Sequence, residues 1–267
     1  MAVNVIICGA VGRMGKLLVS LSHEHAELRL IGAVEMPEHW ALGKDAGEVA
    51  GIGAIGVKVT ADYAALAAPD TVTLDFTLPG AALKHLQIAA ANGAAIVIGT
   101  TGFSAEQRAE AEKLAPQTRT LIAPNMSVGV NVLLKVVADV ARILKEGFDP
   151  EIMEIHHRFK MDAPSGTALA LGRAIAAAQG KDFDHQAKLA REGITGQRTD
   201  EEIGIVALRG GDAVGDHTVV FAGFGERLEL THRAQSRECL ARGAIRAALW
   251  LPLQQPGLYS MKDVLGL

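Results

Sequence analysis

The segment VNVIICGAVGRMG, residues 3–15, decides the fold. Val3–Cys8 is a continuous apolar run, which is typical of a buried parallel strand. A turn with the spacing Gly-x-x-Gly-x-x-Gly follows, and apolar residues then recur at helical spacing up to Leu21. In such a turn, backbone N–H groups and the positive end of the helix can approach a pyrophosphate. The segment therefore predicts the first strand, turn and helix of a dinucleotide-binding sheet.

The glycine spacing leaves a second interpretation open, namely a close-packed turn without a ligand. Val11 stands where the more common Gly-x-Gly-x-x-Gly pattern has its middle glycine. Glu35 favours the ligand, because it ends a second apolar strand, Leu28–Val34, where an acid can accept hydrogen bonds from ribose hydroxyls. Glu35 alone could equally be a solvated loop carboxylate, but the strand, turn, helix and acid together favour a nucleotide.

Strand and helix patterns alternate through the first half of the chain. Strands are predicted at 71–76, 94–98 and 120–123, with helices at 81–92 and from Ser104 onward. This alternation predicts a parallel sheet with helices on both faces. Residues 37–56 have no clear period and are predicted to form a long loop with short pieces of structure.

Two of these strands end in segments suited to binding a ligand, Gly99–Gly102 and Ala123–Met126. Ligands of open α/β sheets gather at the carboxyl ends of the strands. We therefore expect both segments to lie where a nicotinamide is held. For the first segment, an ordinary turn with a helix cap at Ser104 is the alternative.

The second half of the chain has a different pattern. Helices are predicted at 127–144, 165–178 and 237–249, and strands at 149–157, 203–209, 217–221 and 227–232. Glycine-rich turns between the last strands favour an antiparallel or mixed sheet. The fold class is therefore α/β: a Rossmann-like parallel-sheet domain plus a smaller α+β domain with a mostly antiparallel or mixed sheet. The domain boundary is expected near Asn125–Val128.

Composition narrows the functional class. The 267 residues carry a formal charge of −4 without a long run of one sign, which argues against a nucleic-acid partner. Cys8 and Cys239 are far apart and show no disulfide or metal-ligand spacing. We see no signal-peptide pattern and no apolar run of membrane-spanning length. We therefore expect a cytoplasmic protein without a membrane partner.

Residues 154–167, EIHHRFKMDAPSGT, hold the densest set of reactive groups. They place the imidazoles of His156 and His157 beside the cations Arg158 and Lys160. His156 and Lys160 are candidates for proton transfer, since the environment can tune the pKa of both. A metal site at the paired histidines is disfavoured because no third ligand has suitable spacing and the neighbouring cations would repel a metal ion. Surface polarity of a loop is the remaining alternative.

The same segment runs into a helix start. Pro164 and Ser165 are helix-opening residues. Gly166 and Thr167 would present backbone N–H groups at the positive end of that helix, which can bind a carboxylate. Cations just before such a helix suggest a small acidic substrate.

These motifs closely resemble those of the dihydrodipicolinate reductase family. The resemblance covers essentially the whole chain. It is carried by GAVGRMG (9–15), DFT (75–77), VIGTTGF (97–103), APNMSVGVN (123–131), EIHHRFKMDAPSGTA (154–168), RGGDAVGDHTVVF (209–221) and GERLELTHRA (225–234).

The resemblance implies an NAD(P)H-dependent oxidoreductase of the diaminopimelate route to lysine. Such an enzyme reduces a cyclic unsaturated dicarboxylate, derived from (2S,4S)-4-hydroxy-2,3,4,5-tetrahydrodipicolinate, to (S)-2,3,4,5-tetrahydrodipicolinate. By the motif match, His156 is the catalytic proton donor and acceptor. Lys160 is a further proton donor that also holds substrate. His157 contacts substrate, and Gly166 and Thr167 bind a carboxylate.

The resemblance also implies the cofactor contacts, two domains and a homotetramer. The domains are residues 1–126 with 237–267, which bind the dinucleotide, and residues 127–236, which bind substrate and join the tetramer through their sheet. The implied cofactor-binding residues are Gly9, Ala10, Val11, Gly12, Arg13, Met14, Glu35, Gly99, Thr100, Thr101, Ala123, Pro124, Asn125 and Met126. No metal is implied.

One departure bears on the cofactor. Many family members carry Arg after the acidic residue, where it can receive the 2′-phosphate of NADPH, but here Met36 follows Glu35. We therefore expect NADH to be used at least as well as NADPH. Two other hypotheses stay open at this point: another Rossmann oxidoreductase, resembling a homoserine or aspartate dehydrogenase, and a sensor that binds NADH without turnover. Lys160–Thr167 argues against the first, and the intact His156 and Lys160 argue against the second.

Overall fold

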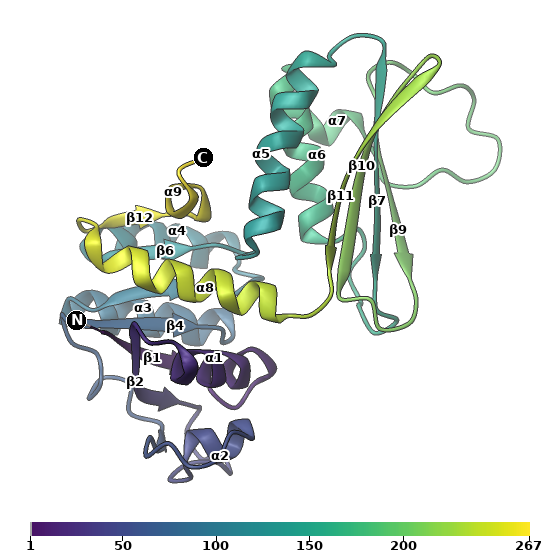
Figure 1. Ribbon diagram of the computed structural model, residues 1–267. Coiled ribbons are helices and arrows are strands. Elements are labelled where there is room, and N and C mark those ends of the chain that lie inside the picture. The colour runs from purple at the N-terminus through teal and green to yellow at the C-terminus, as the bar shows by residue number, and fades with distance from the viewer. Residues whose placement is uncertain (1) are drawn as a thin grey trace. The chain divides into compact units, whose positions relative to one another are not determined.

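The structure, a computed structural model, describes residues 2–267 and divides the chain into two compact units (Figure 1). Unit 1 runs to Val128 and resumes at Glu238–Leu267, and unit 2 is Gly129–Arg237. No helix in residues 2–267 combines the length and apolar character needed to cross a membrane.

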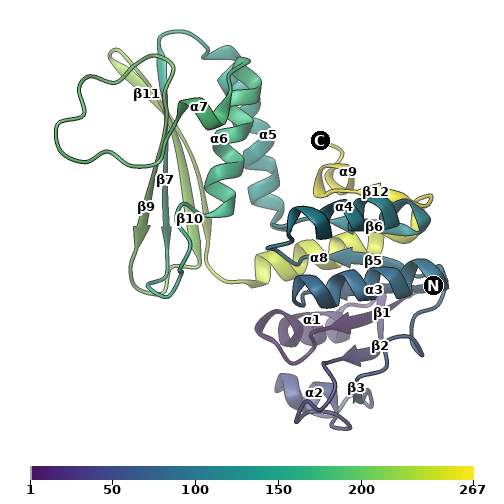
Figure 2. The same cartoon turned by 180° about the vertical axis from the view of Figure 1, so that it is seen from behind.

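Unit 1 contains a seven-stranded sheet in the order β12-β6-β5-β4-β1-β2-β3, and all its strand pairs are parallel (Figure 2). The chain winds outward in both directions from β1, so the switch point of the sheet lies between β1 and β4, as in doubly wound nucleotide-binding sheets. The strands are β1 (Val3–Cys8), β2 (Leu28–Val34), β3 (Val59–Thr60), β4 (Thr71–Asp75), β5 (Ala95–Ile98), β6 (Arg119–Ile122) and β12 (Gly257–Tyr259).

Helices cover both faces of this sheet. They are α1 (Arg13–Glu24), α2 (Ala46–Ala50), α3 (Pro79–Asn92), α4 (Ala105–Leu114), α8 (Glu238–Trp250) and α9 (Met261–Leu265). The alternation of side chains along β1 explains the two layers. Val5 and Ile7 are buried with α1 and α8 on one face, while Ile6 and Cys8 are buried with α3 and α4 on the other. The apolar run of β1 therefore supplies both halves of the core.

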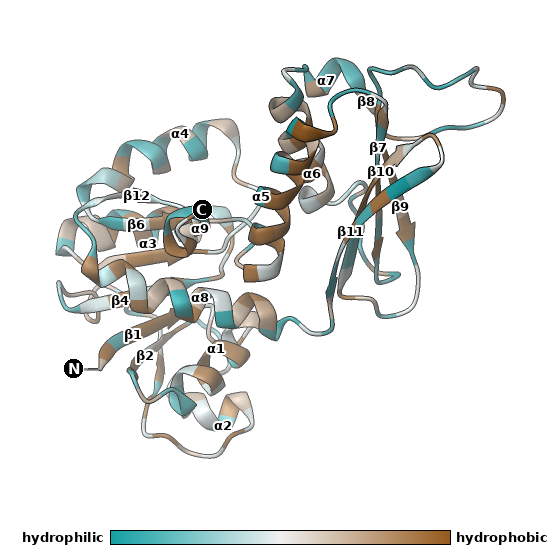
Figure 3. Cartoon of the chain, turned by 45° about the horizontal axis from the view of Figure 1, so that its top comes forward, coloured by the Kyte–Doolittle hydropathy of each residue, from teal (hydrophilic) through white to brown (hydrophobic). Residues whose placement is uncertain are grey.

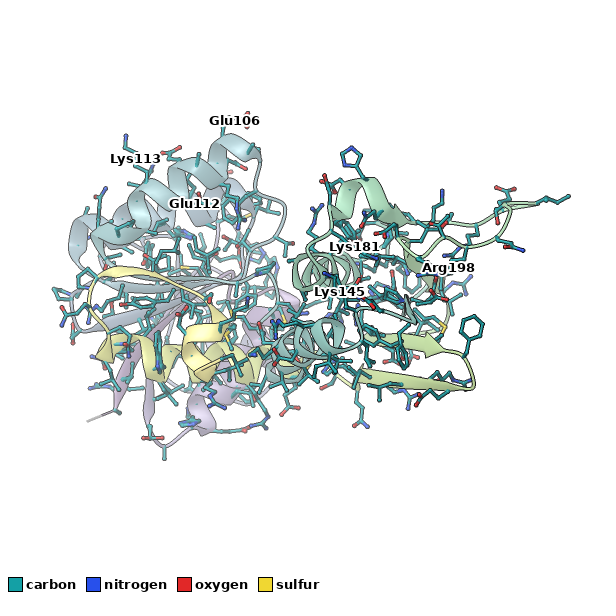
Figure 4. The ribbon with its side chains drawn as sticks, turned by 90° about the horizontal axis from the view of Figure 1, so that it is seen from above. Glu106, Glu112, Lys113, Lys145, Lys181 and Arg198 are labelled. Atoms are coloured by element: carbon teal, nitrogen blue, oxygen red, sulfur yellow. The ribbon has the colours of Figure 1, made fainter. Side chains whose placement is uncertain are left out.

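Helix α4 begins where the sequence predicts. The Ser104 side chain accepts from the Gln107 N–H and the Gln107 side chain accepts from the Ser104 N–H, which forms a capping box. Among its charged side chains, Glu106 and Lys113 point away from the sheet (Figure 4).

Unit 2 is a mixed five-stranded sheet in the order β11-β10-β7-β9-β8, with β10 antiparallel to both neighbours and the other pairs parallel. Helices α5 and α6 pack on one face through a core that includes Ile152, Ile205 and Phe221. Hydrophobic residues follow α5 and the inner strands (Figure 3). The elements are α5 (Val128–Ile143), β7 (Phe148–His156), α6 (Gly166–Gln179), α7 (Phe183–Gln186), β8 (Ala187–Lys188), β9 (Ile203–Arg209), β10 (Gly215–Gly223) and β11 (Glu226–Ala234).

The other face of the unit 2 sheet carries no helix of unit 2. Met153, Val206 and Leu208 lie on it, since the register places Val206 beside Met153 and Leu208 beside Ile155. The three side chains are 45%, 47% and 51% exposed. We call this surface the open sheet face.

The predicted and observed elements agree along most of the chain, and the differences are short elements. The short helix α2 fits the prediction of a long loop with short pieces of structure at 37–56. The elements that were not predicted are β3, α7, β8, β12 and α9. Strand β12 has only three residues, so it offers no apolar period, and its pairing with β6 across more than a hundred residues gives it its place.

Candidate active site

The glycine turn between β1 and α1 is held by backbone hydrogen bonds and carries no obstructing side chain. Gly9 has a φ of +76°, and its N–H and that of Ala10 donate to the Val34 carbonyl at 2.9 and 3.1 Å. A Cβ on Gly15 would lie 2.1 Å from the Gly9 carbonyl oxygen, so only glycine lets α1 pack this close to the turn. Gly12 precedes α1 without a side-chain cap. The turn therefore fits a pyrophosphate at the start of α1.

The carboxylate of Glu35 lies against this turn. Its Oε2 accepts from the Val11 N–H at 3.2 Å, and its Oε1 accepts from the Met36 N–H at 3.0 Å. The structure thus brings the predicted acid and the predicted turn together. The side chain of Met36 is 65% exposed and puts no cation beside Glu35.

The loops after β4, β5 and β6 lie at the same edge of the sheet because the strands are parallel. The Gly99 N–H donates to the Asp75 carbonyl at 2.8 Å, and the Ala123 N–H donates to the Ile98 carbonyl at 3.0 Å. Gly99–Thr101 and Ala123–Met126 therefore follow neighbouring strands, as predicted, at the carboxyl edge that also holds the glycine turn.

Asp75 organises this edge, although it was not predicted as a site residue. The side chain has no exposed surface. Its Oδ1 accepts from the Thr77 N–H at 3.0 Å, the Thr77 hydroxyl at 2.7 Å and the Thr100 hydroxyl at 3.4 Å. Its Oδ2 lies 2.6 Å from Nδ1 of His85. Asp75 thus ties the loops after β4 and β5 to α3.

Cys8, Asp75 and His85 offer three ligand atoms within 4.8 Å of one another. Burial raises the pKa of the Cys8 thiol well above its ordinary value, which keeps the sulfur protonated. Hydrogen bonds already occupy both carboxylate oxygens of Asp75. These features explain the cluster as a structural hydrogen-bond network, and we assign no metal to it.

In unit 2, the predicted chemical residues lie at one end of the sheet, on the face that α5 and α6 cover. His156 is the last residue of β7 and is 9% exposed. The register pairs it with Arg209 of β9, while Glu154 lies opposite His217 of β10. The strands therefore place four ionisable side chains together. Two of them, Arg209 and His217, were not predicted as site residues and appear in the sequence only as part of a family motif.

Glu154 is the centre of this group, with 1% of its surface exposed. Its oxygens accept from both terminal nitrogens of Arg209 at 2.9 and 3.0 Å, and from the Ser165 N–H at 3.0 Å. Nδ1 of His156 lies 2.5 Å from Oε2. Burial alone would raise the pKa of Glu154, but the hydrogen bonds from Arg209, His156 and Ser165 outweigh it and hold the pKa below its ordinary value.

The loop after β7 is fixed by the loop between β9 and β10. The His157 and Arg158 N–H groups donate to carbonyls of that loop at 2.7 and 3.1 Å, and the Gly210 N–H donates to the His156 carbonyl at 3.0 Å. Lys160 contacts Asp162 at 2.9 Å, and its side chain is 21% exposed. The loop thus holds an imidazole and an ammonium at defined positions.

Helix α6 begins beside this loop. Ser165 caps it by accepting from the Ala168 N–H at 3.2 Å, and its hydroxyl lies 3.0 Å from Nε2 of His217. Burial, with His156 nearby, lowers the pKa of His217 to about 4, so this imidazole is neutral at pH 7. Gly166 and Thr167 are the first two residues of the helix, as predicted. The arrangement can bind an anion at the helix start and exchange a proton at His156.

Comparison with known proteins gives a consistent result. The family profile "Dihydrodipicolinate reductase, N-terminus" matches residues 3–126, and "Dihydrodipicolinate reductase, C-terminus" matches residues 129–265. Proteins named 4-hydroxy-tetrahydrodipicolinate reductase from Citrifermentans bemidjiense and Syntrophobacter fumaroxidans are 51% and 52% identical over 265 residues, covering 99% of each chain. A dipicolinate-bound dihydrodipicolinate reductase from Paenisporosarcina sp. TG-14 superposes with a TM-score of 0.76 at 26% identity, covering 98% of this chain and 99% of that one.

Proposed function

The chain belongs to the dihydrodipicolinate reductase family, and on that premise we propose that it is the NAD(P)H-dependent 4-hydroxy-tetrahydrodipicolinate reductase of the diaminopimelate route to lysine. Its substrate is the dihydrodipicolinate-type intermediate formed from (2S,4S)-4-hydroxy-2,3,4,5-tetrahydrodipicolinate, and its product is (S)-2,3,4,5-tetrahydrodipicolinate. The observation that carries the proposal is in unit 2, where Glu154 hydrogen-bonds both His156 and Ser165 at the start of α6, and Lys160 is close enough to lower the pKa of His156.

The residues of unit 1 fit a dinucleotide. The N–H groups at the start of α1 would hold the pyrophosphate, and Glu35 would accept hydrogen bonds from the adenosine ribose. Gly99–Thr101 and Ala123–Met126 would hold the nicotinamide end at the carboxyl edge of the sheet. A bound nicotinamide supplies the hydride.

The residues of unit 2 fit a small dicarboxylate. The N–H groups of Gly166 and Thr167, at the positive end of α6, would bind one carboxylate. The Lys160 ammonium and His157 would bind the rest of the substrate and stabilise the negative charge that develops during reduction. His156 would then deliver a proton to the reduced ring system.

A coupled assay tests this proposal. Aspartate semialdehyde and pyruvate are supplied to the preceding synthase, and oxidation of NADH or NADPH is followed after the protein is added. We expect cofactor oxidation that requires aspartate semialdehyde, pyruvate and the synthase. Reduction of NAD⁺ with homoserine or aspartate as the substrate, or binding of NADH without any turnover, would contradict the proposal.

For the cofactor preference, we propose that NADH is used at least as well as NADPH. The support is that the exposed Met36 follows Glu35, so no cation at position 36 offsets the repulsion between this acid and a 2′-phosphate. Met36→Arg should raise kcat/KM for NADPH by about tenfold, the effect of roughly 1.4 kcal/mol, and leave the value for NADH nearly unchanged. A wild-type enzyme with a strong NADPH preference would contradict this.

We propose further that the protein is a homotetramer joined through the open sheet face. Met153, Val206 and Leu208 form an exposed apolar patch there, and such patches on folded domains commonly mark association surfaces. The cytoplasmic location stays a prediction.

A further inference from the structure

The carboxylate of Glu154 is buried and hydrogen-bonded through both of its oxygens. It is 1% exposed, and its oxygens accept from Arg209, the Ser165 N–H and His156. A buried carboxylate is costly unless it is paired and hydrogen-bonded, and here it has a bidentate guanidinium partner. Arg209 is itself held by the Asp162 carbonyl at 2.6 Å. The position of the negative charge is therefore fixed next to one ring nitrogen of His156.

The other ring nitrogen of His156 is left open. Within residues 2–267, Nε2 has no hydrogen-bond partner, and the facing residue is Gly215. A Cβ at position 215 would lie 2.8 Å from Nε2, so a larger residue would cover this atom. With Nδ1 donating to Glu154, Nε2 is the nitrogen that can exchange a proton with a ligand.

The charges around the ring act in opposite directions. Burial lowers the pKa of His156 below its ordinary value; Glu154 raises it and offsets part of this effect, and Lys160 and Arg209 lower it further. His217 lies 5.2 Å away, ring to ring, but is neutral at pH 7. Among these neighbours, Glu154 is thus the group that favours protonation of His156. A doubly anionic substrate would add negative charge and favour protonation further.

We infer that Glu154 is a positioning residue for proton transfer. It holds the His156 ring by Nδ1, selects the tautomer that leaves Nε2 toward the substrate, and stabilises the imidazolium from which the proton leaves. In this step the Nε2–H bond breaks and the proton goes to the ring system made anionic by hydride addition. The imidazole returns to its neutral form with its remaining proton still on Nδ1, hydrogen-bonded to Glu154, and solvent later restores the proton on Nε2. The inference rests on the proposed function, because it requires His156 to transfer this proton.

The test compares Glu154→Gln with Glu154→Asp and with Glu146→Gln, which removes an exposed carboxylate from the same unit. Glu154→Gln should lower kcat by ten- to a hundredfold, as loss of an orienting partner does elsewhere. KM and the Kd of dipicolinate, used as an unreactive dicarboxylate, should change by less than about threefold. Glu154→Asp should recover part of kcat, and Glu146→Gln should match the wild type.

The pH profile separates positioning from a merely structural role. The proton donor must be protonated, so kcat falls as the pH rises through the pKa of His156 in the complex. Removing the carboxylate lowers that pKa, and the fall should therefore begin at a lower pH in Glu154→Gln. An unchanged profile with kcat within twofold of wild type would overturn the inference.

A measurement on the wild type keeps the inference testable if the variants do not fold. NMR of ¹⁵N-histidine-labelled protein reports which nitrogen of neutral His156 carries the proton, and we expect Nδ1. A proton on Nε2 would overturn the inference. This measurement needs no turnover, so its failure is distinguishable from failure of the coupled assay, which would count against the proposed function.

Discussion

Two buried carboxylates, Asp75 in unit 1 and Glu154 in unit 2, each hold a histidine through Nδ1, at 2.6 and 2.5 Å. Both also accept backbone and side-chain hydrogen bonds from other loops, so each one fixes several segments at once. The difference lies in the histidine: Nε2 of His156 faces a glycine, whereas the His85 ring packs edge-on against Tyr63 at 4.9 Å. Under the proposed function, the same pairing therefore serves proton transfer in unit 2 and loop geometry in unit 1.

Substitutions of His156 and of Lys160 should change kcat and KM in different ways. His156→Ala should lower kcat by about a hundredfold with little change in KM, because general acid catalysis contributes about that much. Lys160→Ala should lower kcat and raise KM together, since the ammonium both binds the substrate and stabilises its developing charge. Steady-state kinetics in the coupled assay measures both effects. The control is Lys145→Ala, which removes an exposed lysine of the same unit (Figure 4). Near-normal kcat/KM in both variants would contradict the role assignment.

His217 predicts a pH dependence of stability. Its pKa falls from the ordinary 6.5 to about 4 in the folded protein because it is buried as a neutral ring. The folded pKa lies below the unfolded pKa, so protonation favours the unfolded chain. The contribution of the neutral His217 ring to the free energy of unfolding is therefore fully present above pH 6.5 and is lost as the pH falls toward 4. The loss of unfolding free energy approaches roughly 3 kcal/mol, because a change of one pKa unit is worth about 1.4 kcal/mol.

Urea unfolding at pH 7 and pH 4.5 measures this effect. The wild type should lose roughly 2 to 3 kcal/mol more unfolding free energy between the two conditions than His217→Gln, which has no titrating ring. Groups that titrate in both proteins cancel in the comparison. Equal losses would show that His217 is protonated in the folded protein or that its pKa is not shifted.

Some of the individual site residues could be predicted from the sequence, and others could not. His156 and Lys160 stand in a dense reactive segment, and Glu35 ends a recognisable strand, so local pattern was enough to predict them. Asp75 and Arg209 act through partners that are 10 and 55 residues away. Their contacts depend on strand register, which no local period encodes.

At the scale of elements, the close packing of α1 against the β1 turn is the feature on which nucleotide binding depends. Gly15→Ala would place a methyl group 2.1 Å from the Gly9 carbonyl oxygen, so α1 must move away from the turn. We expect NADH affinity to fall by tenfold or more, with a loss of 1–3 kcal/mol in stability, as overpacking elsewhere causes. Gly80→Ala in α3 is the matched control, because its Cβ would meet nothing within 4 Å. Unchanged NADH binding in Gly15→Ala, measured by calorimetry, would contradict this account.

The elements themselves were predictable where apolar period and length agree. β1, β2 and β9 have the predicted bounds, since each is an apolar run ended by polar or glycine-rich sequence. β8 and β12 were missed because strands of two or three residues take their conformation from their neighbours. The mixed order of the second sheet also follows from tertiary pairing, as β7 pairs parallel with β9 and antiparallel with β10.

At the scale of the whole molecule, the open sheet face predicts the oligomeric state. Val206→Glu places a charge in the centre of the apolar patch, where burial against another copy would be costly. Size-exclusion chromatography with light scattering should find a tetramer for the wild type and smaller species for Val206→Glu. Leu253→Glu, at an 81% exposed apolar side chain of unit 1, should leave the tetramer intact. A monomeric wild type would contradict the proposed assembly.

Under the proposed function, a bound dinucleotide delivers hydride to a doubly anionic ring held by Lys160, His156 and the start of α6. The most direct measurement is isotope transfer: the coupled reaction is run with NADH deuterated at both C4 positions, and the tetrahydrodipicolinate formed is analysed by mass spectrometry. We predict one deuterium in the product ring for each NADH oxidised. Oxidation of NADH without deuterium in the ring, or a product that forms without NADH, would contradict the account.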